Sequence, residues 1–331
     1  MHYVLRDMKK NISIFAIILW SIACWTEMHG QAFPISALWG GDPYRINPAG
    51  GEGKGYWTLD AHTRSQWAAI NGAPIDFGFE LHGSVGRRSG VGLRYFQEQI
   101  GLEKRTILGG SYSYTSGTPV GRLTAALGAG ASRWLLDGGK VRTPGGKYGA
   151  TPDHKDDVLP ATLYAKYNAF FQVGVALSSP IGKFGISFEK LGVTGWPLKA
   201  KGSYNPNGVC NVYWKNKYLV MQHFVVLPQV RWYSDGITFQ EEISLGMEPL
   251  QNIFVAAALR VDRWSAIEGL VLSAGVKLRK GVVLYFAFDQ SFGISRQYLI
   301  NSSNEVSLIY TWGHEKGKGN RVPIIYNPVY L

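Results

Sequence analysis

Two histidines, each placed two residues after a carboxylate, are the side chains of this sequence best suited to chemistry. His62 follows Asp60, and His82 follows Glu80. Imidazole and carboxylate groups that converge can hold a transition metal, so these four residues define a candidate metal site. Such a site needs several ligands to converge, and the interpretation that we favour is a hydrogen-bonded network in the protein interior.

The same region holds charged groups that could serve as a general acid and base. The candidates are Asp60, Asp76, Glu80, Arg64 and Arg94. The interiors of β-barrels also fill with such charges, which then serve packing and solvation. The chain has no GxGxxG after a strand, no P-loop, no GxSxG and no HExxH. We therefore predict a protein that is not an enzyme, with no catalytic, cofactor-binding or metal residue.

The segments that carry these groups alternate between apolar and polar side chains, as strands do. Residues 57–61 and 75–82 place apolar side chains at odd positions and polar or small ones at even positions. The polar faces mix Gly, Ala and Ser with opposite charges, which favours a narrow lumen over the wet face of a sandwich. About fourteen strands are predicted, at 55–64, 75–83, 89–97, 106–115, 122–135, 170–178, 183–191, 216–226, 228–234, 237–247, 252–261, 268–278, 281–290 and 304–312.

The composition fits an outer-membrane barrel and a soluble all-β protein equally well. Of 331 residues only 17% are charged, 13% are aromatic and 41 are glycine, and the mean hydropathy is −0.06. In a barrel the apolar outer face and the polar inner face average to such a value. The net charge of +11 suits an anionic membrane surface. Nucleic acid is not a predicted partner, because zinc-finger spacing, a basic helix and RNA-binding strand motifs are all missing.

The N-terminus predicts export. Lys9 and Lys10 precede an apolar run over 12–25 and then a polar stretch, which is the pattern of a signal peptide cleaved between residues 30 and 31. The rest of the sequence contains no run of 18 apolar residues, so no membrane-spanning helix is predicted. Cys24 weakly resembles a lipoprotein processing site, and we favour a plain signal-peptide cysteine. Cys210 is then the only cysteine of the mature chain, and we interpret it as structural.

The connections between the predicted strands give an orientation. Outer-membrane barrels have short periplasmic turns and longer external loops. If the first strand runs outward, the longest connections, 136–169 and 192–215, are external, and a turn at Pro228 is periplasmic. The expected organisation is then a signal peptide at 1–30, a periplasmic or luminal lead-in at 31–54, a barrel at 55–312 and a periplasmic tail at 313–331.

Tryptophans near the predicted strand ends indicate aromatic girdles at two membrane interfaces, whereas a soluble core would bury them in mid-strand. They are Trp57, Trp67, Trp134, Trp232, Trp264 and Trp312. Glu241 interrupts the apolar face of its strand. It marks either a wrong register or a position near an interface edge.

Three motifs stand out in the N-terminal part of the chain: INPAG at 46–50, RSQWAAINGAP at 64–74 and LHGSVGRRSGVGL at 81–93. Together they resemble the PorP/SprF family of type IX secretion outer-membrane proteins. FVAAALRVDRW, LYFAFDQSF and NEVSLIYTW then follow in the order of the family's last strands. The resemblance implies structural or partner-contact roles for the matching residues Asn47, Pro48, Arg64, Gln66, Trp67, Gly72, Ala73 and Pro74.

The resemblance implies an all-β, antiparallel transmembrane barrel in the outer membrane of a Gram-negative bacterium. It implies a non-enzymatic component of type IX secretion that supports export or surface presentation of proteins with C-terminal sorting domains, gliding adhesins included. The implied partners are other secretion components, both periplasmic proteins and outer-membrane lipoproteins, together with exported cargo and outer-membrane lipid. No cofactor is implied.

Two alternatives remain open at this point. The first is an outer-membrane channel or a transporter of hydrophobic compounds, which an open lumen would support. The second is a soluble exported β-sandwich that binds glycans, which recovery in a soluble fraction would establish.

Overall fold

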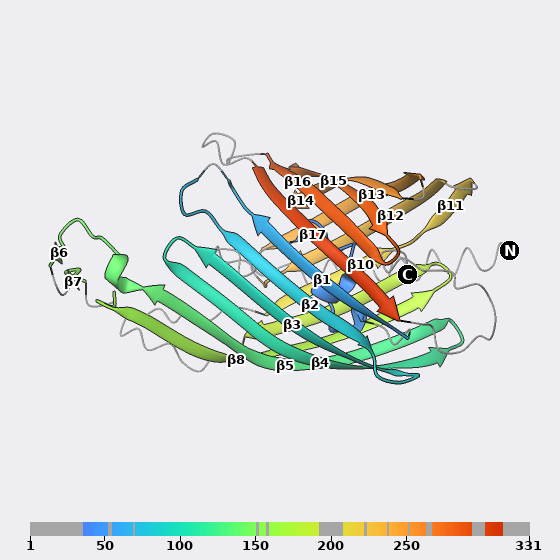
Figure 1. Cartoon of the computed structure of the whole chain (residues 1–331), viewed down its shortest axis with the longest axis horizontal. Coiled ribbons are helices and arrows are strands. Elements are labelled where there is room, and N and C mark those ends of the chain that lie inside the picture. The colour runs from blue at the N-terminus through green and yellow to red at the C-terminus, as the bar shows by residue number, and fades with distance from the viewer. Residues whose placement is uncertain are drawn as a thin grey trace.

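The chain folds into a closed antiparallel β-barrel of 14 strands (Figure 1). The computed structural model describes residues 36–51, 55–68, 70–149, 152–156, 159–191, 208–221, 224–236, 238–250, 252–262, 267–292 and 302–313. Each strand pairs with its neighbours in the sequence, β1 (Tyr56–Ser65) pairs with β17 (Ser302–Gly313), and the ladder is continuous around the barrel. The predicted signal peptide at 1–30, which includes Cys24, lies outside the described residues, as do Trp264 and residues 314–331.

The barrel wall agrees with the predicted strands in number and, for most strands, in position. The remaining strands are β2 (Ile75–Ser84), β3 (Ser89–Ile100), β4 (Glu103–Thr118), β5 (Gly121–Asp137), β8 (Leu163–Ser179), β9 (Gly182–Leu191), β10 (Val209–Lys215), β11 (Tyr218–Met221), β12 (Phe224–Ser234), β13 (Phe239–Leu250), β14 (Ile253–Asp262), β15 (Ile267–Arg279) and β16 (Val282–Ser291). The short strands β6 (Lys147–Tyr148) and β7 (Pro152–Asp153) form a separate hairpin.

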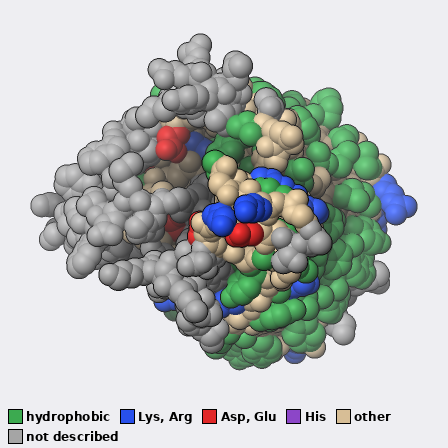
Figure 2. Space-filling model, turned by 90° about the vertical axis from the view of Figure 1, so that its left-hand side faces the viewer, with side chains coloured by type: hydrophobic (Ala, Val, Ile, Leu, Met, Phe, Trp, Pro, Cys, Tyr) green, Lys and Arg blue, Asp and Glu red, His purple; other side chains and the backbone are tan. Residues whose placement is uncertain are grey.

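The burial pattern is that of a membrane barrel, with apolar side chains outside and polar ones inside. On β2, Ile75 and Phe77 are 57% and 44% exposed, whereas Asp76 and Glu80 are 4% and 1% exposed. Hydrophobic side chains cover much of the described outer wall in Figure 2. Since lipid can cover an apolar wall and a closed barrel satisfies its backbone hydrogen bonds internally, this arrangement suits a bilayer. Within the described residues, no helix has the length and apolar character needed to cross a membrane.

The predicted turn at Pro228 is wrong. Pro228 lies within β12, opposite Leu245 of β13. On its other side the partner strand is interrupted at residues 216–217, between β10 and β11, which both pair with β12. A proline has no N–H to donate to a ladder, and the interruption removes the need for one.

The two long connections are also shorter than predicted. The seven residues 209–215 of the predicted loop 192–215 form β10. In the other connection, β5 continues to Asp137 and β8 begins at Leu163. Figure 1 shows β5 and β8 reaching beyond the other strands on the side of β6 and β7. The added strand residues 163–169 and 209–215 contain no glycine and include Tyr, Val and Trp, which favour strands.

The two ends of the barrel differ. At one end, here called the turn end, residues 85–88, 119–120, 180–181 and 280–281 form tight turns, β1 begins and β17 finishes. The opposite end, the loop end, carries residues 66–74 and 138–162. Trp57 and Trp312 are register partners at the turn end, while Trp134 and Trp232 lie near strand ends at the loop end. Tryptophans therefore lie near both ends of the barrel.

Glu241 is the third residue of β13, near the loop end, and pairs with Trp232. The register of β13 is the predicted one, because Ile243 and Leu245 are 51% and 52% exposed on the outer wall. The position of Glu241 near an interface edge, and not a wrong register, explains the interruption.

Candidate functional site

Residues 36–51, here called the plug segment, lie inside the barrel (blue in Figure 1). Two 3-10 turns, Pro43–Arg45 and Pro48–Gly50, shape the segment. The side chain of Asp42 accepts a hydrogen bond from the Tyr44 N–H at 3.1 Å, and that of Asn47 accepts one from Ala49 at 2.8 Å. Asn and Asp are favoured in this capping role, and a proline is preorganised for the first position of the turn. The sequences DPYR and NPAG therefore encode two successive turns.

Arg45 connects the plug segment to the wall. Its guanidinium donates to both carboxylate oxygens of Asp60 on β1, at 2.5 and 2.7 Å, and to Glu305 on β17 at 2.8 Å. It also donates to the Ser307 hydroxyl at 2.6 Å. Burial opposes the charge of Arg45, but Asp60 and Glu305 more than compensate and raise its pKa above the ordinary value. A buried bidentate pair of this kind combines strength with strict geometry.

The ion pairs continue along the inner wall from this point. Glu305 also accepts hydrogen bonds from Ser36 and from the Ala37 N–H, both at 2.7 Å, and lies 3.7 Å from Arg64. Arg64 donates to Asp289 at 2.9 Å, and Asp289 also pairs with Arg260.

The network reaches the plug segment a second time through Glu242. This carboxylate accepts from Arg260 at 2.9 Å and from the indole N–H of Trp39 at 2.6 Å. Charges of both signs therefore alternate from Arg45 to Trp39, and each carboxylate named here has a cationic partner. Buried charges are tolerated only when they are paired in this way.

On the opposite wall, side chains hold the plug segment mainly through its backbone carbonyl groups. Lys183 on β9 donates to the Gly50 carbonyl at 3.3 Å, Lys215 on β10 to Gly40 at 3.2 Å and Arg231 on β12 to Ser36 at 3.2 Å. Conversely, Asn47 donates to the wall carbonyls of Val175 and Ile186, at 3.1 and 3.2 Å. The Ser187 hydroxyl donates to the Ile46 carbonyl. The plug segment is thus held from several sides of the lumen.

Tyr44 and Asp42 both engage His82. The Tyr44 ring stacks on the imidazole with centroids 4.5 Å apart, and its hydroxyl lies 2.7 Å from that of Ser111. Burial raises the pKa of Tyr44 to about 12. Burial would also raise the pKa of Asp42, but His82, 2.9 Å away, and the Tyr44 N–H lower it to about 2. Asp42 is therefore ionised at neutral pH, and the His82 Nε2–H donates to it.

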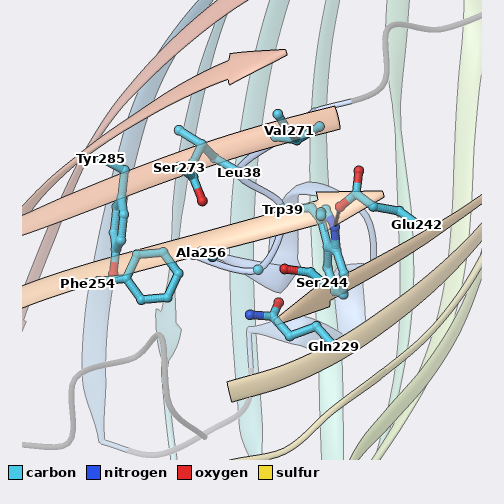
Figure 3. Close-up of a pocket in the computed structure, with 14 residues that line it drawn as sticks. Leu38, Trp39, Gln229, Glu242, Ser244, Phe254, Ala256, Val271, Ser273 and Tyr285 are labelled. Carbon is cyan, nitrogen blue, oxygen red and sulfur yellow. Dashed lines mark hydrogen bonds between the residues drawn. The ribbon is translucent and has the colours of Figure 1, made fainter. Parts of the chain in front are cut away.

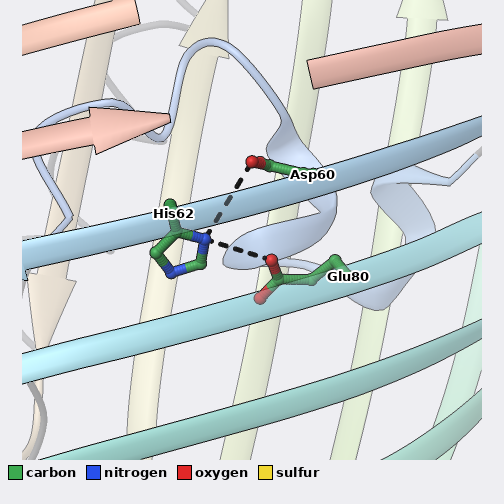
Figure 4. Close-up of side chains that lie close together, drawn as sticks. All are labelled: Asp60, His62 and Glu80. Atoms are coloured by element: carbon green, nitrogen blue, oxygen red, sulfur yellow. Dashed lines mark ion pairs between the residues drawn. The ribbon is translucent and has the colours of Figure 1, made fainter. Parts of the chain in front are cut away.

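The metal hypothesis rests on Asp60, His62 and Glu80, whose ligand atoms lie within 4.8 Å of one another (Figure 4). His62 Nδ1 is 3.2 Å from Glu80 and 4.0 Å from Asp60. Both oxygens of Asp60 already accept from the Arg45 guanidinium, whose positive charge opposes a divalent cation beside it. His82, the fourth predicted candidate, turns to Asp42 instead. The geometry favours the interior network.

A small cavity separates the plug segment from the apolar part of the wall (Figure 3). It has a volume of about 30 Å³ and is lined by Leu38 and Trp39 of the plug segment and by Phe254 and Tyr285 of the wall, among others. Leu38 packs in the same buried apolar cluster as Phe254 and Tyr285. A space of this size accommodates a water molecule and no organic compound.

The RSQWAAINGAP motif divides between the wall and the rim. Arg64 belongs to the interior network, whereas residues 66–74 connect β1 to β2 at the loop end. The Gln66 N–H donates to Pro74 at 2.9 Å, the Ala73 N–H to Ile70 at 3.2 Å and the Gly101 N–H to Gly72 at 2.8 Å. These backbone bonds make the connection an ordered loop.

Two residues of this loop adopt a left-handed backbone. Trp67 has φ of 51° and Gly72 has φ of 78°. Glycine adopts this region freely, whereas tryptophan is strained there. The Trp67 N–H donates to the Ser303 hydroxyl at 3.3 Å, which ties the strained residue to β17.

A comparison with known families agrees with this arrangement. The family model for the type IX secretion system membrane protein PorP/SprF matches residues 35–310. The chain belongs to the PorP/SprF family. The match begins one residue before the described plug segment and includes nearly the whole barrel. No curated protein matches the chain. With its closed barrel and apolar outer wall, this PorP/SprF protein is an outer-membrane protein.

Solved structures similar to this PorP/SprF chain are outer-membrane barrels. The Ralstonia pickettii toluene transporter TbuX is 11% identical with a TM-score of 0.48, over 86% of this chain and 94% of that one. A Pseudomonas aeruginosa FadL homologue is 12% identical with a TM-score of 0.48, over 86% and 95%. Acinetobacter baumannii Omp33 is 6% identical with a TM-score of 0.45, over 79% and 99%. At these identities the similarity concerns the fold alone.

The predicted PorP/SprF motif residues fall into two groups that the fold does not bring together. Asn47 and Pro48 lie in the plug segment, and residues 66–74 lie at the loop-end rim. Arg64 is linked to the plug segment, because it shares Glu305 with Arg45.

Sequence reasoning missed the residues that hold the plug segment, above all Arg45 and Glu305. Their signals were the position of Arg45 two residues before the NPAG motif, and the even spacing of Glu305 and Ser307 on the polar face of the last strand.

Proposed function

We propose that this PorP/SprF protein supports export or surface presentation of proteins with C-terminal sorting domains, gliding adhesins included, as a non-enzymatic component of type IX secretion. The observation that carries the proposal is the plug segment held by ion pairs and hydrogen bonds on several sides of the lumen. A barrel with an occupied interior is suited to holding partners at its rims. Free diffusion through it would require the plug segment to move.

The proposal includes an organisation of the chain. Residues 1–30 are a signal peptide, the turn end faces the periplasm, and the tail at 313–331 continues from β17 on that side. The parts of the connections 138–162 and 192–208 that lie outside the strands are the candidate external contacts for cargo. The tail, with Lys316, Lys318 and Arg321, is a candidate contact for periplasmic secretion components and outer-membrane lipoproteins.

Deletion of the gene in its native bacterium tests the function. We expect proteins with C-terminal sorting domains to accumulate inside the cell and to be lost from the surface, and the intact gene should restore them. Normal surface display in the deletion strain would contradict the proposal. Complementation with a chain that lacks residues 316–331 tests the tail separately. Full export with unchanged co-purification of periplasmic proteins would remove the tail as a contact.

A channel for hydrophobic compounds is the second candidate. The apolar residues around Phe254 and Tyr285 favour it, because they give part of the lumen wall an apolar lining. The cavity there holds only about 30 Å³, so transport would require displacement of the plug segment. Conductance or hydrocarbon uptake by the intact protein in planar bilayers or liposomes would support the channel over the first proposal.

A further inference from the structure

Positive charge gathers at the turn end of the barrel. Seven basic residues lie in the described tight turns or within four residues of them. They are Arg87, Arg88, Arg122, Lys183, Lys277, Arg279 and Lys280. In the described residues of the other strand termini at this end, the same span contains two acidic residues, Asp60 and Glu248. Asp60 is paired with Arg45 of the plug segment. Glu248 lies 4.0 Å from Lys217, so it offsets little of this charge.

The loop end differs, since it carries charges of both signs and several of them are paired. Arg105 lies 2.7 Å from Glu98, and Lys140 lies 2.9 Å from Asp137. Figure 2, which views the molecule from the side of β6 and β7, shows Lys and Arg side chains next to Asp and Glu side chains. The excess of positive charge is therefore a property of the turn end and not of the whole surface.

Strand alternation directs part of this charge toward the barrel mouth and away from lipid. Leu123 is 39% exposed on the outer wall, so the preceding Arg122 belongs to the inner face of β5. Val276 and Leu278 are likewise exposed on the outer wall, at 39% and 58%, which places Lys277 on the inner face of β15. Deeper on the same face, Lys183 contacts the plug segment. Lipid headgroups surround a barrel from outside, so this arrangement favours a partner that approaches the mouth.

We propose that the turn-end mouth is a docking surface for the acidic face of a periplasmic protein. The inference rests on the proposed function for the placement of the turn end in the periplasm. Complementary charge accelerates association and selects among partners. The chain also leaves β17 at this end, and its following residues include Lys316, Lys318 and Arg321.

The test uses the full chain in nanodiscs of zwitterionic lipid, with a fluorescent 16-residue polyglutamate peptide as the probe. Binding is followed by anisotropy at low and high salt. The triple variant Arg87→Glu, Arg279→Glu, Lys280→Glu changes three exposed residues away from the plug segment. The matched control, Lys140→Glu, Lys147→Glu, Lys155→Glu, makes the same charge change at exposed loop-end residues. We expect the turn-end variant to weaken binding about tenfold or more, and the control to retain wild-type affinity within about twofold.

An equal loss in both variants would overturn the proposal, because it would show a response to net charge alone. No binding by the wild-type protein at low salt would also overturn it. Nanodiscs of anionic lipid give the third arm. If anionic lipid removes binding to the wild-type protein, headgroups occupy the basic residues and the partner is lipid, whereas unchanged binding supports a protein partner.

Export of cargo separates this inference from the proposed function. If polyglutamate binds as expected while the gene deletion leaves export intact, the docking surface stands and the secretion role fails. If the deletion blocks export while the two triple variants bind the probe equally, the secretion role stands and the docking surface fails.

Discussion

Arg45 and Asp60 form a bidentate ion pair between the plug segment and the barrel wall, with N–O distances of 2.5 and 2.7 Å. The two residues are 15 positions apart, and both are buried. Arg45 directly precedes the PorP/SprF motif at 46–50, so the pair joins this part of the plug segment to the first strand. It is also the point from which the interior ion-pair network spreads, through Glu305, to Arg64.

Arg45→Met should release the plug segment. The substitution removes the cation that Asp60 and Glu305 share and leaves Glu305 only the more distant Arg64, at 3.7 Å. Loss of one partner of a buried ion pair costs about 3–5 kcal/mol. Chymotrypsin should then cleave the purified protein at Trp39 or Tyr44, which are 1% and 3% exposed in the docked state. Arg142→Met, at an exposed loop arginine, is the control and should stay resistant. Adding Asp60→Asn and Glu305→Gln to Arg45→Met should restore part of the resistance. Wild-type resistance of Arg45→Met alone would contradict the role of the ion pair.

Gly174→Ala should loosen the plug segment by a steric route. A Cβ atom at Gly174 would lie 2.0 Å from Asn47 Oδ1 and 2.9 Å from Pro48 Cδ. Overpacking of this kind costs about 1–3 kcal/mol. Gly117→Ala is the matched control, because a Cβ atom there meets nothing within 4 Å. We expect faster chymotrypsin cleavage of the plug segment in Gly174→Ala than in Gly117→Ala. Identical cleavage rates would show that the close contact between Asn47 and β8 does not hold the plug segment in place.

Acid should weaken the contact between Asp42 and His82. The docked pKa of Asp42 is about 2 and the ordinary value is 3.8. Because docking lowers this pKa, its contribution is full above pH 3.8 and is lost as the pH falls toward 2. The shift corresponds to about 2 kcal/mol. Pepsin is active in this range and can report release. At pH 4, Asp42→Asn should be cleaved faster than wild type, and the two rates should converge near pH 2. A constant ratio of rates across this range would contradict the assignment.

Trp67 offers a test of backbone strain in the rim loop. Its φ of 51° favours glycine over any other residue. Trp67→Gly should therefore be more stable than Trp67→Ala by about 1 kcal/mol, although both lose the indole. The measurement is the temperature at which the barrel loses its compact electrophoretic form. Export by both variants, once assembled, would establish that the loop has a structural role. Lost export from a correctly assembled barrel would instead assign Trp67 a direct contact.

The alternation of side chains was sufficient to predict the wall of this protein. Ile75, Phe77, Asp76 and Glu80 lie on the predicted faces, because a strand of period two has only two faces and lipid accepts only the apolar one. The motifs at 46–50 and 64–74 were sufficient to indicate the PorP/SprF family. Turn residues were less informative. Proline is common in turns, but Pro228 lies in a strand. The partner strand is interrupted opposite it, so no N–H is required at this position.

Only the tertiary structure decided what fills the lumen. Glu305 and Arg45 are 260 positions apart in the sequence, and no local pattern relates them. They meet because closure of the barrel brings β17 beside β1 while the plug segment turns inward. The plug segment also brings Arg45 to Asp60 and Asp42 to His82. The register of β1 and β2 places His62 opposite Gly78 and His82 opposite Thr58, so the two histidines that the sequence suggested as a pair lie apart. Period and composition are local properties that a sequence shows directly, whereas the pairing of buried charges depends on which strands become neighbours.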